Sequence, residues 1–174
     1  MNPKVDILLA TYNGEKYIKE QVESILNQTY ENIQIIISDD CSTDNTRQVL
    51  KEYENNEKIK VFYQEKNLGY VKNFEFLLKQ VKSNLYMLSD QDDVWKKEKV
   101  EKSVEKIESE KLDLVFGDLE VVDENLNTLY KSYNRYMHLI HKIKKYQKDY
   151  RLQYLYNCMT GCTIISRKNW IDKV

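Results

Sequence analysis

The chain has 174 residues, of which 41% are hydrophobic and 32% charged, and this is enough apolar material for one domain with a buried core. Its formal net charge of −1 gives no overall attraction to nucleic acid, and no apolar run is long enough to cross a bilayer. Three cysteines, an odd number, argue against a disulfide framework and favour a reducing compartment, so we expect a cytoplasmic protein.

Short apolar segments alternate with amphipathic segments through the first 110 residues. The isoleucine run at 33–38 is typical of a strand buried on both faces, and Val22 and Ile25 share one face of a helix. This alternation predicts an α/β fold with a mostly parallel sheet and helices on both faces. The expected strands span 5–10, 33–38, 59–63 and 85–88, and the expected helices span 15–28, 45–53, 71–81 and 96–108.

The pattern changes after residue 110. Two consecutive strands at 112–116 and 119–122, followed by a turn at 124–127, predict a small antiparallel element toward the C-terminus. A basic helix or lid is expected over 131–150, then a strand at 163–166 and a helix that starts at 167.

Polar side chains follow three of the expected strands, at 11–13, 39–40 and 90–93. The carboxyl ends of parallel strands meet at one edge of a sheet, so these groups should converge there. The last cluster, Asp90-Gln91-Asp92-Asp93, holds three carboxylates, and such oxygen ligands suit Mg²⁺ or Mn²⁺. The competing interpretation is a solvated acidic turn before a helix.

Five segments together resemble the family-2 glycosyltransferases with the GT-A fold. The cluster followed by Val94 and Trp95, with the later Thr-Gly-Cys-Thr segment at 160–163, is most similar to the rhamnosyltransferase-like branch. The resembling segments are VDILLATYNG at 5–14, SILNQTY at 24–30, ISDDCSTD at 37–44, NLG at 67–69 and DQDDVW at 90–95.

The resemblance implies an enzyme of cell-surface glycan synthesis in bacteria. Such an inverting, metal-dependent transferase moves a sugar from a UDP- or dTDP-sugar, dTDP-rhamnose among them, to a polysaccharide or lipid-linked acceptor. The alternative is a non-catalytic nucleotide-sugar-binding module or an inactive fragment.

The resemblance also implies one GT-A domain over 1–174, truncated at its C-terminus. Residues 1–110 would form the nucleotide-binding half and residues 111–174 the start of the acceptor-side half. An inverting transferase needs a carboxylate base for the acceptor hydroxyl. Because Asp172 is the only acid after Cys162 and looks like a solvent-facing helix residue, we expect the base to lie beyond Val174.

The metal ligands follow from the same resemblance. Asp92 is expected to bind the cation directly, Asp90 to face the ribose and the waters of the metal, and Asp93 to help hold metal or donor. Gln91 is expected to contact the donor. The cofactor implied by the resemblance is Mg²⁺ or Mn²⁺.

The resemblance assigns the rest of the donor site to other strand ends. Asp40 would accept a hydrogen bond from the imide N–H of the pyrimidine, and Thr11 and Tyr12 would line the nucleotide, with Tyr12 stacking on the base. Glu15 would contact the donor, or act as a first-turn helix acid. Lys72 would offset phosphate charge.

Other acids of the donor loop have a structural explanation. Asp39 and Asp44 are expected to cap the helix that follows, with Thr43 or Asp44 at its N-cap position.

Two further patterns leave alternatives open. The stretch 131–151 carries seven Lys or Arg residues and one Asp, which fits contact with the inner face of the membrane or an ordinary surface helix. A zinc site is the weaker interpretation of two histidines and two cysteines, because Cys162 reads better as a small buried residue. The four residues are His138, His141, Cys158 and Cys162.

Overall fold

The computed structural model describes residues 2–138 and 160–173 and contains two compact units. The first, here called the sheet unit, comprises Met1–Val115 and Ile165–Val174. The second, here called the hairpin unit, comprises Phe116–Ile164.

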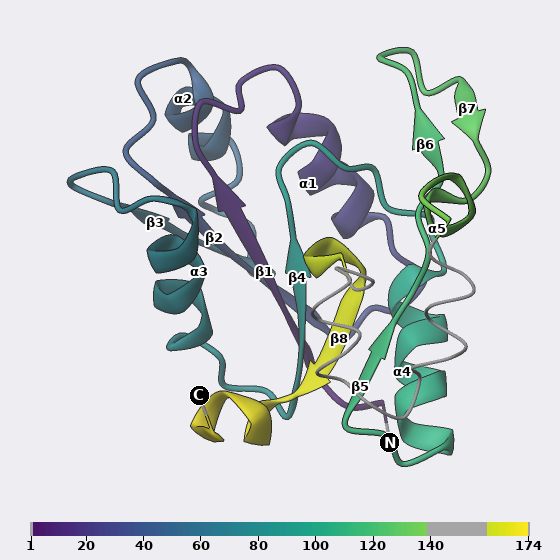
Figure 1. Ribbon diagram of the computed structural model, residues 1–174. Helices are drawn as coiled ribbons and strands as arrows, with labels where there is room; N and C mark the ends of the chain where they lie inside the picture. The colour runs from purple at the N-terminus through teal and green to yellow at the C-terminus, as the bar shows by residue number, and fades with distance from the viewer. Residues whose placement is uncertain (1, 139–159, 174) are drawn as a thin grey trace. The chain divides into compact units, whose positions relative to one another are not determined.

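A six-stranded sheet in the order β3-β2-β1-β4-β8-β5 forms the centre of the fold (Figure 1). The first four strands in this order are parallel, and β8 runs antiparallel to β4. Since β2 and β4 flank β1 on opposite sides, the gap between the ends of β1 and β4 is the topological switch point, where such sheets bind ligands. The strands are β1 (Val5–Thr11), β2 (Ile33–Asp39), β3 (Ile59–Tyr63), β4 (Leu85–Ser89), β5 (Leu114–Phe116) and β8 (Ile164–Arg167).

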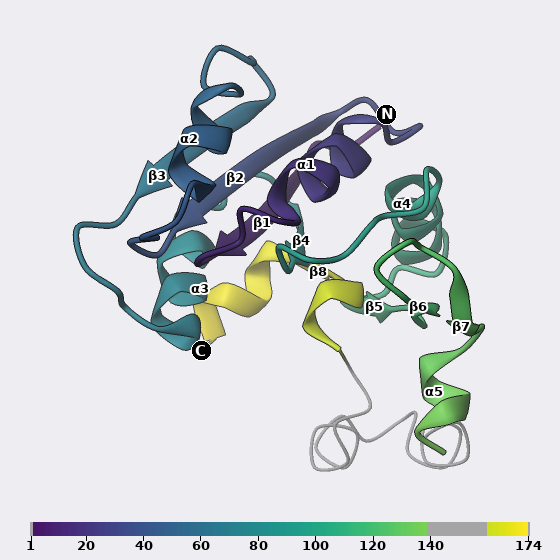
Figure 2. The same ribbon diagram turned by 90° about the horizontal axis from the view of Figure 1, so that it is seen from above.

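Helices cover both faces of the sheet, as Figure 2 shows. Side chains alternate along β1, so Ile7 and Leu9 pack on one side while Leu8 packs on the other. The Ile7 side carries α1 (Ile18–Leu26), α2 (Thr46–Lys51) and α4 (Lys99–Ser109), and the Leu8 side carries α3 (Tyr70–Leu78). The predicted fold class, a mostly parallel sheet between helices, is therefore confirmed.

The hairpin unit contains the predicted antiparallel element. Strands β6 (Val121–Val122) and β7 (Thr128–Tyr130) pair antiparallel around a turn in which Asp123 accepts two backbone N–H bonds. The strand β7 was absent from the sequence prediction. A short helix, α5 (Tyr133–Tyr136), follows. His141 and Cys158 of the candidate zinc site, and most of the basic helix expected over 131–150, lie outside the described residues.

Several helix ends differ from the sequence prediction for identifiable reasons. Helix α4 begins at Lys99 rather than 96, because the carbonyls of Lys96 and Lys97 accept hydrogen bonds from the Gln28 side chain and the Thr29 backbone. The helix expected from 167 is a 3₁₀ helix, η2 (Lys168–Lys173), and a second 3₁₀ turn, η1 (Gly161–Thr163), precedes β8. No helix in the described ranges combines the length and apolar composition that crossing a bilayer requires.

Candidate functional site

Four loops meet at the carboxyl edge of the parallel strands, and side chains link each loop to its neighbour. They are the β1 loop (11–15), the β2 loop (39–45), the β3 loop (64–69) and the acidic loop (90–95) after β4. The sequence predicted convergence of three of these loops, and the register of the sheet brings them together, with Thr11 opposite Asp39 and Leu9 opposite Ser89.

The β1 and β2 loops are joined by hydrogen bonds in both directions. Backbone N–H groups of the β1 loop, which precedes α1, donate to side chains of the β2 loop and of the first turn of α2. Conversely, Glu15 Oε2 accepts from the backbone of Asn45 at 2.8 Å, so its carboxylate has a structural role. The three bonds from the β1 loop run from Asn13 N to Ser42 Oγ, from Gly14 N to Thr46 Oγ1 and from Glu15 N to Asp44 Oδ2.

Asp44 supports the start of α2, although the N-cap position itself is occupied by Asn45 rather than by Thr43 or Asp44. One oxygen of Asp44 accepts from both the backbone and the hydroxyl of Thr46. Partial burial opposes ionisation of Asp44, but the hydrogen bonds from Thr46 and Glu15 outweigh it and lower the pKa of the carboxyl below its usual 3.8.

Gln91 joins the acidic loop to the β1 loop across the switch point. Its Oε1 accepts from the Thr11 hydroxyl at 2.6 Å and from the Tyr12 backbone at 2.9 Å, while its Nε2 donates to the Tyr12 carbonyl at 3.3 Å. A Cβ atom on Gly14 would lie 2.3 Å from Oε1, so only glycine leaves room for this contact. Gln91 therefore sets the spacing of two loops that the sequence had assigned separately to donor binding.

Asp40 joins the β2 loop to the β3 loop. It is 3% exposed, and its two oxygens accept from the backbone N–H groups of Leu68 at 2.6 Å and Gly69 at 2.9 Å. Gly69 has a backbone φ of 80°, in the region that favours glycine. Each Asp40 oxygen has a second lone pair that these bonds leave available.

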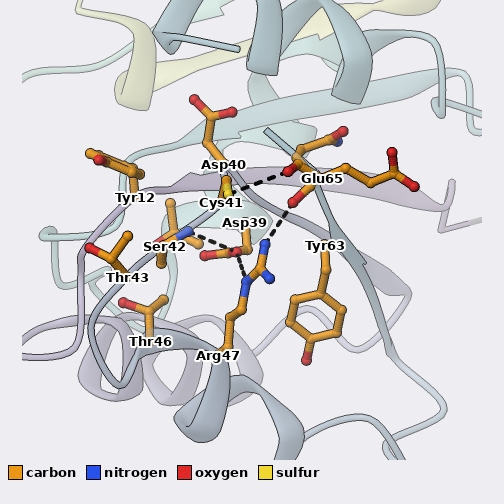
Figure 3. A network of polar contacts seen from close by, with 12 residues as sticks. Tyr12, Asp39, Asp40, Cys41, Ser42, Thr43, Thr46, Arg47, Tyr63 and Glu65 are labelled. Carbon is orange, nitrogen blue, oxygen red and sulfur yellow. Dashed lines mark hydrogen bonds and ion pairs between the residues drawn. The ribbon is translucent and has the colours of Figure 1, made fainter. Parts of the chain in front are cut away.

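Asp39 points away from Asp40 and toward α2 (Figure 3). It is fully buried, and its Oδ2 accepts from Arg47 Nε at 2.6 Å and from the Ser42 backbone at 3.2 Å. Arg47 also donates to the Gln64 carbonyl, so one guanidinium links the β2 and β3 loops. The hydrogen bond to Asp39 raises the pKa of Arg47. Asp39 thus stabilises the loop through Arg47 and the Ser42 backbone, rather than capping α2 as the sequence predicted.

The acidic loop presents its carboxylates in different environments. Asp92 is exposed, whereas Asp90 and Asp93 are partly buried. Asp93 Oδ2 is buried and has no hydrogen-bond partner within 2–138 and 160–173. Trp95, 4% exposed, anchors the end of the loop in the core, with Lys99 Nζ 3.6 Å from the centroid of its ring.

Tyr12 and Lys72 also lie on this edge of the sheet unit. The side chain of Tyr12 is 44% exposed and open to contact from solvent, unlike Thr11, which is buried and bonded to Gln91. Lys72 is exposed in the first turn of α3, three residues after Gly69. The expected buried cysteine is found, since Cys162 is 3% exposed.

Two residues on the helices α1 and α2 support the loops and were not predicted from the sequence. Arg47 was not assigned a role, although a basic residue eight positions after Asp39 is a possible partner for it. Gln21 was not assigned a role either, although it interrupts the apolar stripe of α1 formed by Ile18, Val22 and Ile25. A polar residue in such a stripe is a recognisable signal, because buried amides need hydrogen-bond partners.

Comparison with known proteins places this geometry in a family. The profile described as "Glycosyl transferase family 2" matches residues 6–173. The dTDP-rhamnosyl transferase RfbG of Shigella flexneri is 32% identical over 167 residues, which are 92% of this chain and 54% of RfbG.

Solved structures show the same fold. S. aureus TarS 1-349 superimposes with a TM-score of 0.68 at 24% identity, over 98% of this chain and 48% of that one. The mannosyltransferase PcManGT from Pyrobaculum calidifontis gives 0.69 at 14% identity, over 99% and 47%. The chain thus spans about half the length of these relatives. From the family match over residues 6–173, this chain belongs to glycosyl transferase family 2 and has its GT-A fold.

Proposed function

We propose that the four-loop edge binds a nucleotide-diphosphate sugar together with Mg²⁺ or Mn²⁺, as the donor site of an inverting glycosyltransferase. The observation that carries the proposal is the acidic loop at the switch point, with the Asp93 oxygen buried and unpartnered among the described residues. A buried carboxylate oxygen without a partner is costly, and a hard cation in contact with it would offset that cost.

The three carboxylates of the acidic loop differ in exposure, and their proposed roles differ accordingly. Asp92, which is exposed, would be the accessible ligand for the cation, Asp93 would add the buried oxygen, and Asp90 would contribute on the side of the ribose. When bound, the cation would neutralise charge that grows on the leaving diphosphate. Lys72 lies exposed at the start of α3 and would contribute a further positive charge to the phosphates.

The nucleoside would lie over the β1 and β2 loops. The free lone pairs of Asp40 would accept the imide N–H of a pyrimidine, and the exposed ring of Tyr12 would stack on the base for ~1–3 kcal/mol. Thr11 and Gln91 would act mainly by holding Tyr12, since the Thr11 hydroxyl donates to Gln91 and Gln91 hydrogen-bonds to the Tyr12 backbone. Glu15, bonded to Asn45, would contact the donor only through an exposed edge of its carboxylate.

The comparisons support a UDP- or dTDP-sugar donor. The relative RfbG is named for dTDP-rhamnosyl transfer, and TarS has been solved with UDP and with UDP-GlcNAc. PcManGT was solved with GDP-Man and Mn²⁺, which supports a donor site that uses a divalent metal. We extend the proposal to a polysaccharide or lipid-linked acceptor in cell-surface glycan synthesis at the cytoplasmic side of the membrane.

Calorimetry with UDP, dTDP and GDP, each with and without Mn²⁺, tests the donor site. Mn²⁺ should tighten UDP or dTDP binding at least about tenfold, equivalent to ~1.4 kcal/mol, and GDP should bind more weakly. Asp92→Asn should remove the metal effect, while Asp113→Asn, an exposed acid outside the four loops, should retain it. The proposal would be contradicted if all three nucleotides bound equally well with and without Mn²⁺, or if none of them bound. Metal-dependent binding without sugar transfer by the whole protein would indicate a binding module.

A further inference from the structure

One turn of α1 holds both ends of the acidic loop through a continuous chain of hydrogen bonds. The Trp95 backbone N–H donates to Ser24 Oγ at 3.0 Å, and the Ser24 hydroxyl lies 2.9 Å from Gln21 Oε1. Gln21 Nε2 then donates to Ser89 Oγ at 2.6 Å, and the Ser89 hydroxyl lies 3.2 Å from the Asp90 carbonyl. This series of hydrogen bonds therefore runs from Trp95, the last residue of the acidic loop, to Asp90, its first residue.

This chain of bonds is buried and directional. Gln21 and Ser89 are both fully buried, and Ser24 is partly buried. In each of these bonds the donor group can be the one on the Trp95 side and the acceptor the one on the Asp90 side. Hydrogen bonds aligned in this way strengthen one another in a low-dielectric interior. The single proton of the Ser24 hydroxyl has two acceptors on Gln21, Oε1 at 2.9 Å and the backbone carbonyl at 2.8 Å, which together fix its position on the helix.

The acidic loop depends on these contacts because it has little regular structure. Residues 90–98 are neither helix nor strand, so no ladder of backbone bonds fixes the carboxylates. Ser24 and Gln21, three positions apart, lie on the same face of α1; Ser24 contacts the loop at Trp95, and Gln21 reaches its other end through Ser89. Gln28, one turn further, bonds to the Lys96 carbonyl and so secures the segment beyond Trp95.

We infer that Gln21 and Ser24 are positioning residues that set the cation affinity of the acidic loop without touching the cation. The inference rests on the proposed donor site. Groups that orient metal ligands from behind typically change metal affinity 10–100-fold when they are removed. The chain of bonds fixes the two loop ends, and thereby the separation of Asp90, Asp92 and Asp93.

The competing explanation is that these hydrogen bonds only satisfy buried polar groups and contribute to folding. Asp6 offers a matched control, because its 2% exposed carboxylate accepts from the backbones of Lys82 and Ser83 outside the four loops. Asp6→Asn should lower stability without altering the acidic loop.

The test compares UDP affinity with and without Mn²⁺ in Gln21→Met, Ser24→Ala, Ser24→Thr and Asp6→Asn, with stability measured by urea unfolding. Gln21→Met and Ser24→Ala should each lose about tenfold of the Mn²⁺ enhancement, with metal-free UDP affinity within about twofold of wild type. Ser24→Thr retains the hydroxyl and should retain the enhancement. Asp6→Asn should retain it despite a comparable loss of stability.

The outcomes separate the inference from the proposed function. If Gln21→Met does not fold, Ser24→Ala and Ser24→Thr alone decide, because only the hydroxyl distinguishes them at the loop end. An unchanged enhancement in Ser24→Ala, or an equal loss in Asp6→Asn, would overturn the positioning role while leaving the metal site intact. No Mn²⁺ enhancement in the wild-type chain would instead overturn the proposed donor site.

Discussion

Replacing Gly14 with alanine should displace Gln91 and loosen the junction between the β1 loop and the acidic loop. The new Cβ would lie 2.3 Å from Gln91 Oε1 and 2.9 Å from the Thr11 hydroxyl, both shorter than real contacts allow. Gln91 is the far end of a side chain and can move, so the chain should still fold. Its movement would break the two bonds that Oε1 accepts from Thr11 and Tyr12.

The expected cost follows from those two bonds. Each intramolecular hydrogen bond contributes about 0.5–1.5 kcal/mol net, so their loss should cost ~1–3 kcal/mol of unfolding free energy. Any glycine-to-alanine change also restricts the unfolded chain, which stabilises by about 0.4–1 kcal/mol. Gly117→Ala isolates that effect, because a Cβ there meets no atom within 4 Å and its φ lies outside the left-handed region.

Urea unfolding of four variants measures the prediction. Gly14→Ala should be ~1–3 kcal/mol less stable than Gly117→Ala. In a Gln91→Ala background, most of the steric conflict is absent, so adding Gly14→Ala should cost less than ~1 kcal/mol. An equal cost of Gly14→Ala with and without the Gln91 side chain would refute the idea that Gln91 holds the two loops at this spacing.

Two further predictions concern the β2 loop. The pKa of Asp44 is lowered in the folded chain, so its stabilising contribution is complete above about pH 4 and is lost as pH falls through the folded value. Asp44→Asn should therefore flatten the acid side of the stability–pH curve measured by urea unfolding. Arg47→Ala should cost ~1–3 kcal/mol, because it leaves the buried Asp39 oxygen without its donor. Arg47→Lys should restore only part of this, because one ammonium cannot reproduce the fork to Asp39 and Gln64.

Each of these two predictions has a result that would contradict it. An unchanged acid limb in Asp44→Asn would show that the carboxylate is not stabilised in the folded chain. Full recovery of stability by Arg47→Lys would show that charge alone, rather than the two directed bonds, accounts for the Arg47 contribution.

The sheet and its covering helices follow from local sequence because the apolar patterns are unambiguous. The isoleucine run of β2 and the spacing of Val22 and Ile25 in α1 each fix an element and the face that it buries. Polar residues at the strand ends then predict the functional edge, since parallel strands bring their carboxyl ends together.

The contacts that organise this edge could not be read in the same way. Gln91 bonds to Thr11 and Tyr12 across about eighty positions, and Gln21 bonds to Ser89 across 68. Nothing local distinguishes these amides from surface glutamines, apart from the place of Gln21 in an apolar stripe. The start of α4 was mispredicted for a related reason, because Gln28 and Thr29 bond to the carbonyls before it.

The most direct test of the donor site is the position of a manganese ion in crystals grown with UDP and Mn²⁺. Anomalous scattering should reveal one ion within about 2.2 Å of a carboxylate oxygen of Asp92, on the diphosphate side of the acidic loop. Nucleotide bound over Tyr12 and Asp40 should accompany it. An ion bound elsewhere, or nucleotide bound at this edge with no ion near Asp92, would contradict the account.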